Sequence, residues 1–195
     1  MDSTAKIILI VGGIGAGKSA VMKLISTCGK PTYDCDARAK TLVNTDPGLR
    51  REIVALLGEQ AYSDGVYDTR WVAKRIFADS QLRDRLNGIV HPAVISDIGA
   101  VARKTGGILF IETALPKQSG LDLHAHQVWR VTAPDDVRVA RVMARNNVPA
   151  NEVLKRIQAQ RPYESPIEGE KQIINDGIHA IIPQVYRLMD GIYEK

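Results

Sequence analysis

A glycine-rich segment near the N-terminus limits this chain to a small set of folds. Residues 12–19 read Gly-Gly-Ile-Gly-Ala-Gly-Lys-Ser and follow the apolar, β-branched run 7–11. The run predicts a buried strand of a parallel sheet, and the apolar spacing of Val21, Leu24 and Ile25 predicts a helix after the glycines. A strand, a glycine-rich turn and a helix in this order predict an α/β fold with a parallel sheet.

The glycine-rich segment has the pattern Gly-x-x-x-x-Gly-Lys-Ser/Thr of a phosphate-binding P-loop. Its glycines allow backbone N–H groups to turn toward phosphate oxygens, and the following helix adds the positive end of its dipole. Lys18 can reach the β- and γ-phosphates, while the Ser19 hydroxyl can bind Mg²⁺. We therefore predict a nucleoside triphosphate site made by Gly13, Ile14, Gly15, Ala16, Gly17, Lys18, Ser19 and Ala20.

The rest of the chain predicts one sheet and a long helical insertion. With the run 7–11, short apolar or extended segments predict a five-stranded parallel sheet, at 31–34, 108–112, 127–132 and 172–175. The stretch between the second and third strands is rich in helix formers and has no convincing strand. Helices are predicted at 37–43, 48–57, 69–78, 80–87, 92–104, 134–146, 151–160 and 178–193. The break before residue 92 is predicted because Pro92 biases His91 away from a helical backbone.

Two carboxylates follow the second predicted strand, at Asp34 and Asp36. Ligands of open parallel sheets bind at the carboxyl ends of the strands. Asp36 would then lie near the γ-phosphate, where it could deprotonate an acceptor hydroxyl or help to hold Mg²⁺ through water. Either residue could instead cap the helix that follows, and the spacing leaves both roles open.

Arginines are concentrated after the fourth predicted strand. Arg138, Arg141 and Arg145 share one face of a predicted helix. Residues 136–163 contain six basic and two acidic side chains, which accounts for the whole net charge of +4. The charge therefore indicates a mobile lid that brings arginines over a triphosphate, with an ordinary solvated face as the alternative.

Several classes of protein are excluded by composition. No apolar run approaches the ~20 residues of a membrane-spanning helix, and no signal peptide is evident, so we expect a cytoplasmic protein with no membrane partner. Aromatic residues make up 5% of the chain and do not alternate with basic ones, so we expect no nucleic-acid partner.

His91 is more typical of a buried, hydrogen-bonded histidine than of a catalytic base. We expect a monomer or a weak homo-oligomer.

Taken together, the sequence motifs of this chain resemble those of the dephospho-CoA kinase family over nearly the whole length. The P-loop is shared with many kinases, but it is combined here with Asp34-Cys35-Asp36 and with Leu-Asn-Gly-Ile-Val-His-Pro at 86–92. Ile-Phe-Ala-Asp at 76–79 and Arg-Val-Met-Ala-Arg-Asn at 141–146 also match the family. Gln160 and the stretch 173–177 match less tightly.

The resemblance implies transfer of phosphate from MgATP to the ribose 3′-hydroxyl of dephospho-CoA, giving CoA and ADP in the last step of coenzyme A synthesis. It implies that Asp36 is the general base and that Ser19 and Asp36 serve Mg²⁺. Lys18, Arg141 and Arg145 would hold or stabilise the phosphates. The acceptor would be bound by Asp36, His91 and Lys40. At the position of Lys40 the family often has Arg.

The resemblance also implies a P-loop NTPase three-layer sandwich with two helical attachments. The nucleotide-binding core would comprise 1–37, 106–137 and 166–195, the acceptor domain 38–105 and the lid 138–165. The segment 113–118 departs from the family, with Pro116 and Lys117 where apolar residues are expected and Gln118 in place of an acid. The alternatives are another small-molecule P-loop kinase, acting on a nucleoside, nucleotide or sugar acid, and a nucleotide-binding regulatory NTPase.

Overall fold

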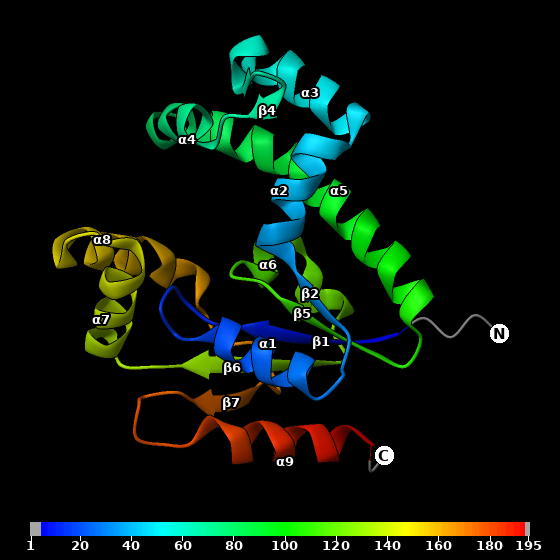
Figure 1. The fold of residues 1–195 in the computed structure, drawn as a ribbon, viewed down its shortest axis with the longest axis vertical. Helices are drawn as coiled ribbons and strands as arrows, with labels where there is room; N and C mark the ends of the chain where they lie inside the picture. Colours follow the sequence, from blue (N-terminus) through cyan, green and yellow to red (C-terminus); the bar gives the residue numbers. More distant parts are fainter. Residues whose placement is uncertain (1–4, 194–195) are drawn as a thin grey trace. The chain divides into compact units, whose positions relative to one another are not determined.

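The computed structural model describes residues 5–193, which form two compact units (Figure 1). Of these residues, the first unit contains 5–33 and 102–193, and the second contains Asp34–Val101.

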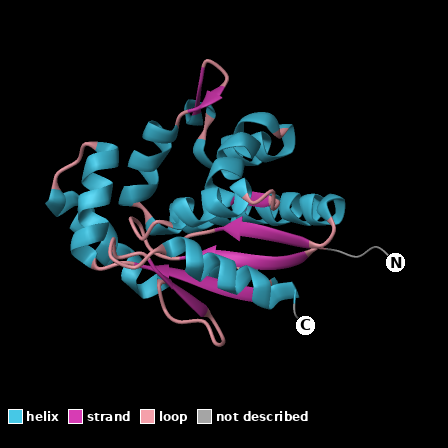
Figure 2. Cartoon of the chain, turned by 60° about the horizontal axis from the view of Figure 1, so that its bottom comes forward, coloured by secondary structure: helices cyan, strands magenta, loops and turns pink. Residues whose placement is uncertain are grey.

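A five-stranded sheet forms the centre of the first unit (Figure 2). Its strand order is β2-β5-β1-β6-β7, and β1 pairs in parallel with both β5 and β6. The strands are β1 (Lys6–Val11), β2 (Thr32–Asp34), β5 (Ile108–Glu112), β6 (Gln127–Thr132) and β7 (Lys171–Ile174). Each begins and ends within one residue of the predicted run, so the predicted five-stranded parallel sheet is confirmed.

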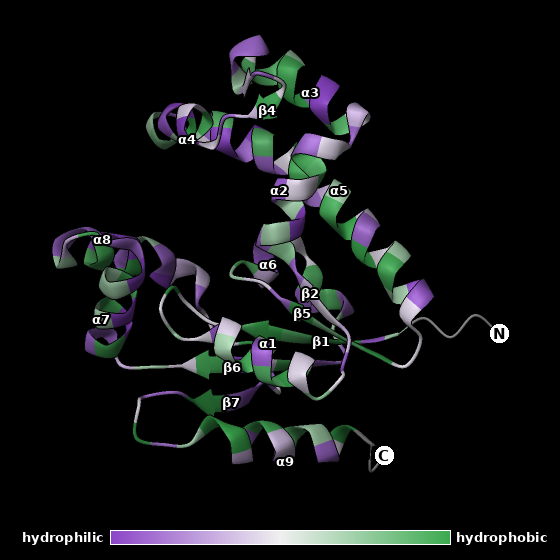
Figure 3. Ribbon diagram, viewed as in Figure 1, coloured by the Kyte–Doolittle hydropathy of each residue, from purple (hydrophilic) through white to green (hydrophobic). Residues whose placement is uncertain are grey.

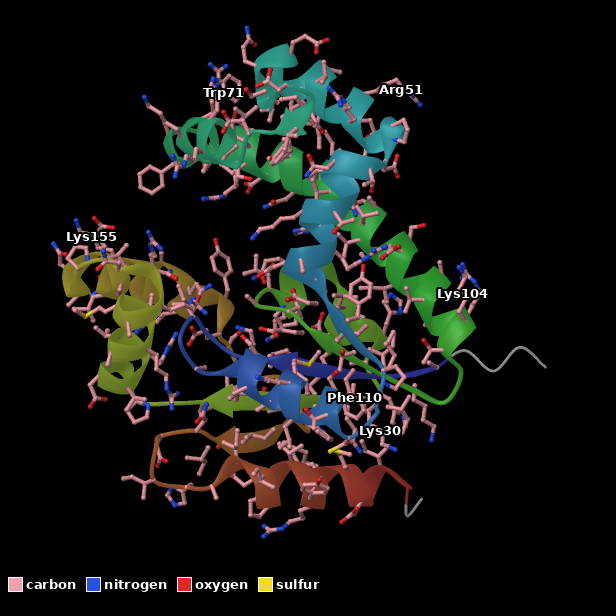
Figure 4. All side chains as sticks on the ribbon, viewed as in Figure 1. Lys30, Arg51, Trp71, Lys104, Phe110 and Lys155 are labelled. Atoms are coloured by element: carbon pink, nitrogen blue, oxygen red, sulfur yellow. The ribbon has the colours of Figure 1, made fainter. Side chains whose placement is uncertain are left out.

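Alternate residues of the central strands point to opposite faces of the sheet, and both sets are buried. Ile8 and Ile10 contribute to one core, while Leu9 and Val11 point the other way. The first core is closed by α1 (Lys18–Thr27) and α9 (Ile181–Tyr193), and it includes an edge-to-face contact between Phe110 and Trp129. Phe110 is labelled in Figure 4, and the central strands are largely green in Figure 3.

The remaining elements of the first unit follow β5 and β6. They are α6 (Pro116–Ser119), η2 (Leu121–His124), α7 (Asp135–Asn146), α8 (Ala150–Gln160) and η3 (Arg161–Tyr163). The structure confirms the predicted helices that became α7, α8 and α9, and Pro183 lies in the first turn of α9, where a missing N–H costs no hydrogen bond. The short helices α6 and η2 were not predicted, because four residues give too little periodicity to recognise.

Helices and one short hairpin make up the second unit. It contains α2 (Cys35–Thr45), α3 (Pro47–Leu57), η1 (Glu59–Ala61), β3 (Tyr62–Ser63), β4 (Val66–Tyr67), α4 (Thr69–Ala78) and most of α5 (Ser80–Thr105). The expectation that this stretch has no strand is wrong, because β3 and β4 form a short antiparallel hairpin. Its turn places Asp64 and Gly65 at φ values of 50° and 80°, which suits the Asp-Gly pair. The Gly65 turn between Tyr62 and Tyr67 is predicted by the sequence, but the two strands were missed because each has only two residues.

The predicted break at Pro92 is also wrong, since α5 is one helix of 26 residues with Pro92 inside it. His91 is therefore helical, and it is partly exposed rather than buried. Proline removes the N–H that would bond the carbonyl four residues earlier, which belongs to Gly88. Gly88 is exposed, so water can satisfy that carbonyl, and the helix continues. Among the helices of residues 5–193, none has the length and apolar character needed to cross a membrane.

An ion pair between Arg130 and Glu170 fixes the segment that leads into β7. Arg130 Nε donates to Glu170 Oε1 at 2.7 Å, and both side chains are about nine-tenths buried. Glu170 also accepts from the Ile167 N–H at 3.0 Å. Burial alone would raise the pKa of the Glu170 carboxyl, but the hydrogen bonds from Arg130 and Ile167 outweigh it and hold the pKa below its ordinary value.

This pair predicts a loss of stability in acid. A carboxyl whose pKa is lowered in the folded state stabilises the fold above its ordinary value, near 4.5, and that contribution disappears as the pH falls further. Glu170→Gln should lower the free energy of unfolding at pH 7 by about 1–3 kcal/mol and flatten its dependence on pH below 5. Denaturant unfolding at several pH values measures both effects.

Glu168→Gln is the matched control, because Glu168 is exposed. Its free energy of unfolding at pH 7 should stay within about 0.5 kcal/mol of the parent. Equal pH profiles for the parent and Glu170→Gln would contradict this role of the ion pair.

Candidate active site

The glycine-rich loop connects β1 to α1 and lies tightly against neighbouring backbone. Gly12, Gly15 and Gly17 have φ values of 149°, 78° and 99°, which L side chains rarely adopt. A Cβ on Gly12 would collide with the Val131 carbonyl at the end of β6, and one on Gly15 would lie 2.6 Å from the Arg138 carbonyl in α7. Glycine is therefore required for two reasons, the backbone conformation and the lack of space.

Lys18 begins α1 and points toward the end of β5. Its Nζ lies 3.9 Å from Glu112 Oε1, and both side chains are largely buried. The two residues meet because β1 and β5 are neighbours and Glu112 is the last residue of β5. This geometry places the Glu112 carboxylate beside the P-loop lysine, as the order of the strands requires.

The three arginines of α7 have different surroundings. Arg138 is buried, and its guanidinium donates to the Ile14 carbonyl at 2.9 Å and to Glu164 Oε1 at 2.8 Å. Arg145 is exposed, and its Nε donates to the side chain of Asn146 at 3.1 Å. The helical face shared by these arginines therefore divides into a buried structural end and an exposed end.

Arg141 lies between these two and contacts both the P-loop and the residue after β7. Its guanidinium donates to the carbonyl of Asn175 at 2.8 Å and to the Asn175 side chain at 3.1 Å. It also lies 3.4 Å from the carbonyl of Ala16. Arg141 is thus a P-loop neighbour, as expected from its position on the helix after the fourth strand.

Asn175 is a site residue to which the sequence assigned no role. Its Nδ2 donates to the Ala16 carbonyl at 3.0 Å, and its backbone N–H donates to the Thr132 carbonyl at 2.8 Å. A Cβ on Gly17 would collide with the Asn175 side chain. The available signal was the place of a polar residue directly after the last strand, at the edge where ligands bind.

The carboxylates after β2 have separate surroundings. Asp34 Oδ1 accepts from the Ala37 N–H at 3.0 Å and so caps α2, which was one of the two roles left open for it. Asp36 lies in the first turn of α2 and is exposed. The structure brings Lys18, Ser19 and Arg141 together in the first unit. The predicted residues Asp36, Lys40 and His91 belong to the second unit, where Lys40 is exposed and His91 is partly exposed.

Comparisons with known proteins decide the family. A family model described as dephospho-CoA kinase matches residues 6–180, which include the whole second unit and the first unit as far as the start of α9. This chain belongs to the dephospho-CoA kinase family. Dephospho-CoA kinase of Bacteroides fragilis is 34% identical over 189 residues, covering 95% of this chain and 92% of the relative. That of Geobacter sulfurreducens is 33% identical, covering 88% and 90%.

Solved structures agree with this membership. The structure of TT1252 from Thermus thermophilus has a TM-score of 0.80 and 30% identity, covering 96% of both chains. Dephospho-CoA kinase from Campylobacter jejuni has a TM-score of 0.68 at 17% identity, covering 96% of this chain and 97% of that one. A shikimate kinase from Acinetobacter baumannii, with a TM-score of 0.57 and 15% identity over 98% and 95%, shares the P-loop NTPase fold. A dephospho-CoA kinase family member is a phosphotransferase with a nucleotide-binding P-loop, and the kinase family implies ATP as a substrate.

One residue of this dephospho-CoA kinase family member that departs from the family pattern makes well-defined hydrogen bonds. Lys117, which stands where an apolar residue was expected, donates from Nζ to Ser165 Oγ and to the Pro166 carbonyl, both at 3.0 Å. Arg130 donates to the Ser165 carbonyl at 3.1 Å. Lys117 therefore helps to fix the segment between η3 and β7 to α6.

The crowding at Gly15 leads to a prediction for nucleotide binding. Gly15→Ala would force the P-loop or α7 to move, because the new Cβ would lie 2.6 Å from a backbone oxygen. We expect the Kd for ATP to rise by about tenfold or more, measured by calorimetry. Gly29→Ala is the control, since Gly29 also has a positive φ, 71°, but no atom within 4 Å of the added Cβ. If both variants bound ATP like the parent, the crowding at Gly15 would have no functional consequence.

Proposed function

We propose that this protein transfers the γ-phosphoryl group of ATP to the ribose 3′-hydroxyl of dephospho-CoA, giving CoA and ADP. The observation that carries the proposal is the extent of the family match, which spans the P-loop unit and the helical unit alike. A P-loop alone would indicate only a nucleotide-binding protein. The relatives from Bacteroides fragilis and Geobacter sulfurreducens support the same reaction, because both are called dephospho-CoA kinase.

The P-loop side of the site would hold ATP. The P-loop segment from Gly13 to Ala20 would surround the phosphates, with the Ile14 N–H held by Gln160 instead, and Lys18 would bind the β- and γ-phosphates. Arg141, already beside the loop, and Arg145 would bind phosphate oxygens and stabilise charge on the transferring group. A triphosphate carries more charge than Glu112, so it can compete for Lys18.

Magnesium fits the residues that are present. Mg²⁺ keeps several waters and usually takes only one or two protein oxygens besides phosphate oxygens. Ser19, in the first turn of α1, can supply a hydroxyl, and Asp36 would act through water. When bound, the ion neutralises phosphate charge during the transfer.

Asp36 would be the general base for the acceptor hydroxyl, with Lys40 and His91 also contacting the acceptor. We assign the acceptor to residues 38–105 and the nucleotide to a core of 1–37, 106–137 and 166–195. Residues 138–165 would be a lid that excludes water from the γ-phosphate and so limits wasteful hydrolysis of ATP.

We infer a cytoplasmic protein, monomeric or weakly associated with copies of itself, whose partner is a small molecule rather than nucleic acid or a membrane. Another small-molecule kinase is less well supported, because the likeness to shikimate kinase is one of fold alone.

An acceptor screen tests the reaction. ADP release with MgATP should be fast with dephospho-CoA and near background with adenosine, AMP, shikimate or gluconate. Faster release with any of the other four acceptors would overturn the proposed substrate. Stimulation by nucleic acid, with none by dephospho-CoA, would indicate a regulatory NTPase instead.

Removing the proposed base tests the assignment of Asp36. Asp36→Asn keeps the size of the side chain but cannot take a proton at neutral pH, so kcat should fall by about 10²- to 10⁴-fold with the Kd for ATP nearly unchanged. Asp46→Asn is the control, because Asp46 caps α3 and asparagine caps equally well. Near-normal turnover of Asp36→Asn would remove Asp36 as the base.

A further inference from the structure

The P-loop residue Ile14 makes three kinds of contact with α7 and α8, through its N–H, its carbonyl and its side chain. Its N–H donates to Gln160 Oε1 at 2.7 Å, and its carbonyl accepts from Arg138 Nε at 2.9 Å. Its side chain packs against the buried cluster of Val142, Val153 and Ile157. These contacts come from both helices, so the position of Ile14 depends on the α7–α8 hairpin, residues 135–160.

Gln160 has an unusual place in this arrangement, because it is the last residue of α8 and binds a P-loop amide. P-loop amides ordinarily turn toward phosphate oxygens, whereas the N–H of Ile14 is turned to a side chain of the protein. The next residue, Gly15, lies close to the Arg138 carbonyl. The hairpin therefore sets the backbone of two successive loop residues before any nucleotide contacts them.

We propose that Gln160 is a positioning residue for phosphate binding. By accepting from Ile14, its carboxamide fixes the loop so that the amides from Gly15 to Lys18 are oriented in advance. Ordering the loop beforehand removes an entropic cost that ATP would otherwise have to meet on binding. The inference rests on the proposed function only in that the P-loop binds the phosphates of ATP.

The test removes the acceptor without shortening the side chain. Gln160→Met has nearly the same length but only a weak acceptor, so the Ile14 amide should lose its hydrogen bond. Amide hydrogen exchange at Ile14, followed by NMR without nucleotide, should become faster by about 3- to 10-fold, the factor expected from one lost hydrogen bond. By the same argument, the Kd for ATP should rise about 3- to 10-fold, with the KM for dephospho-CoA within about twofold of the parent.

Two further variants separate positioning from general destabilisation. Gln158→Met is the matched control on the same helix, since Gln158 is exposed, and it should leave both exchange at Ile14 and the Kd for ATP unchanged. Gln160→Glu keeps an oxygen that can accept from Ile14, so it should retain slow exchange at Ile14 where Gln160→Met does not.

Two results would overturn the proposal. One is equal exchange at Ile14 in the parent and in Gln160→Met. The other is a lower melting temperature of Gln160→Met with an unchanged Kd for ATP, which would give Gln160 a structural role only. ATP binding and exchange need no acceptor, so a failure of the dephospho-CoA reaction would be seen separately in the parent protein.

Discussion

The close approach of the P-loop to the backbone around it is the constraint on which the site depends. Gly12 meets the Val131 carbonyl of β6, and Gly15 meets the Arg138 carbonyl of α7. No side chain fits at either contact, so the loop, the end of the sheet and the start of the α7–α8 hairpin take their positions together. A loop held in this way presents its amides in a fixed arrangement, which is what electrostatic stabilisation of a transferring phosphoryl group requires.

The basic residues after β6 serve two different purposes, which their number alone does not reveal. Arg138 is buried between Ile14 and Glu164, and the exposed Arg161 pairs with Asp135, so both are engaged by groups of the protein itself. Arg141 contacts the loop and Arg145 is exposed. The net charge of +4 is therefore less concentrated over the phosphate site than the sequence suggested, and Arg141 and Arg145 remain the arginines assigned to ATP.

Much of the fold follows from local sequence, but the contacts that complete the site do not. Buried parallel strands are apolar runs, so their bounds were predictable within a residue, and the capping of α2 by Asp34 was one of two stated roles. The continuity of α5 through Pro92 was missed. Proline often ends a helix because the carbonyl four residues earlier loses its hydrogen bond, but here that carbonyl belongs to the exposed Gly88, where water can bind it. Gln160 and Asn175 reach the P-loop across 146 and 159 residues of chain. The place of Asn175 after the last strand was a signal for its role, but no local pattern predicts the contact of Gln160.

In the proposed reaction the γ-phosphoryl group goes to one hydroxyl of one acceptor. Phosphorus NMR of the products formed from MgATP and dephospho-CoA tests it most directly. We expect ADP and a new phosphate monoester on the ribose 3′-oxygen, in equal amounts. Inorganic phosphate in place of that ester, or a phosphate attached at another position, would contradict it.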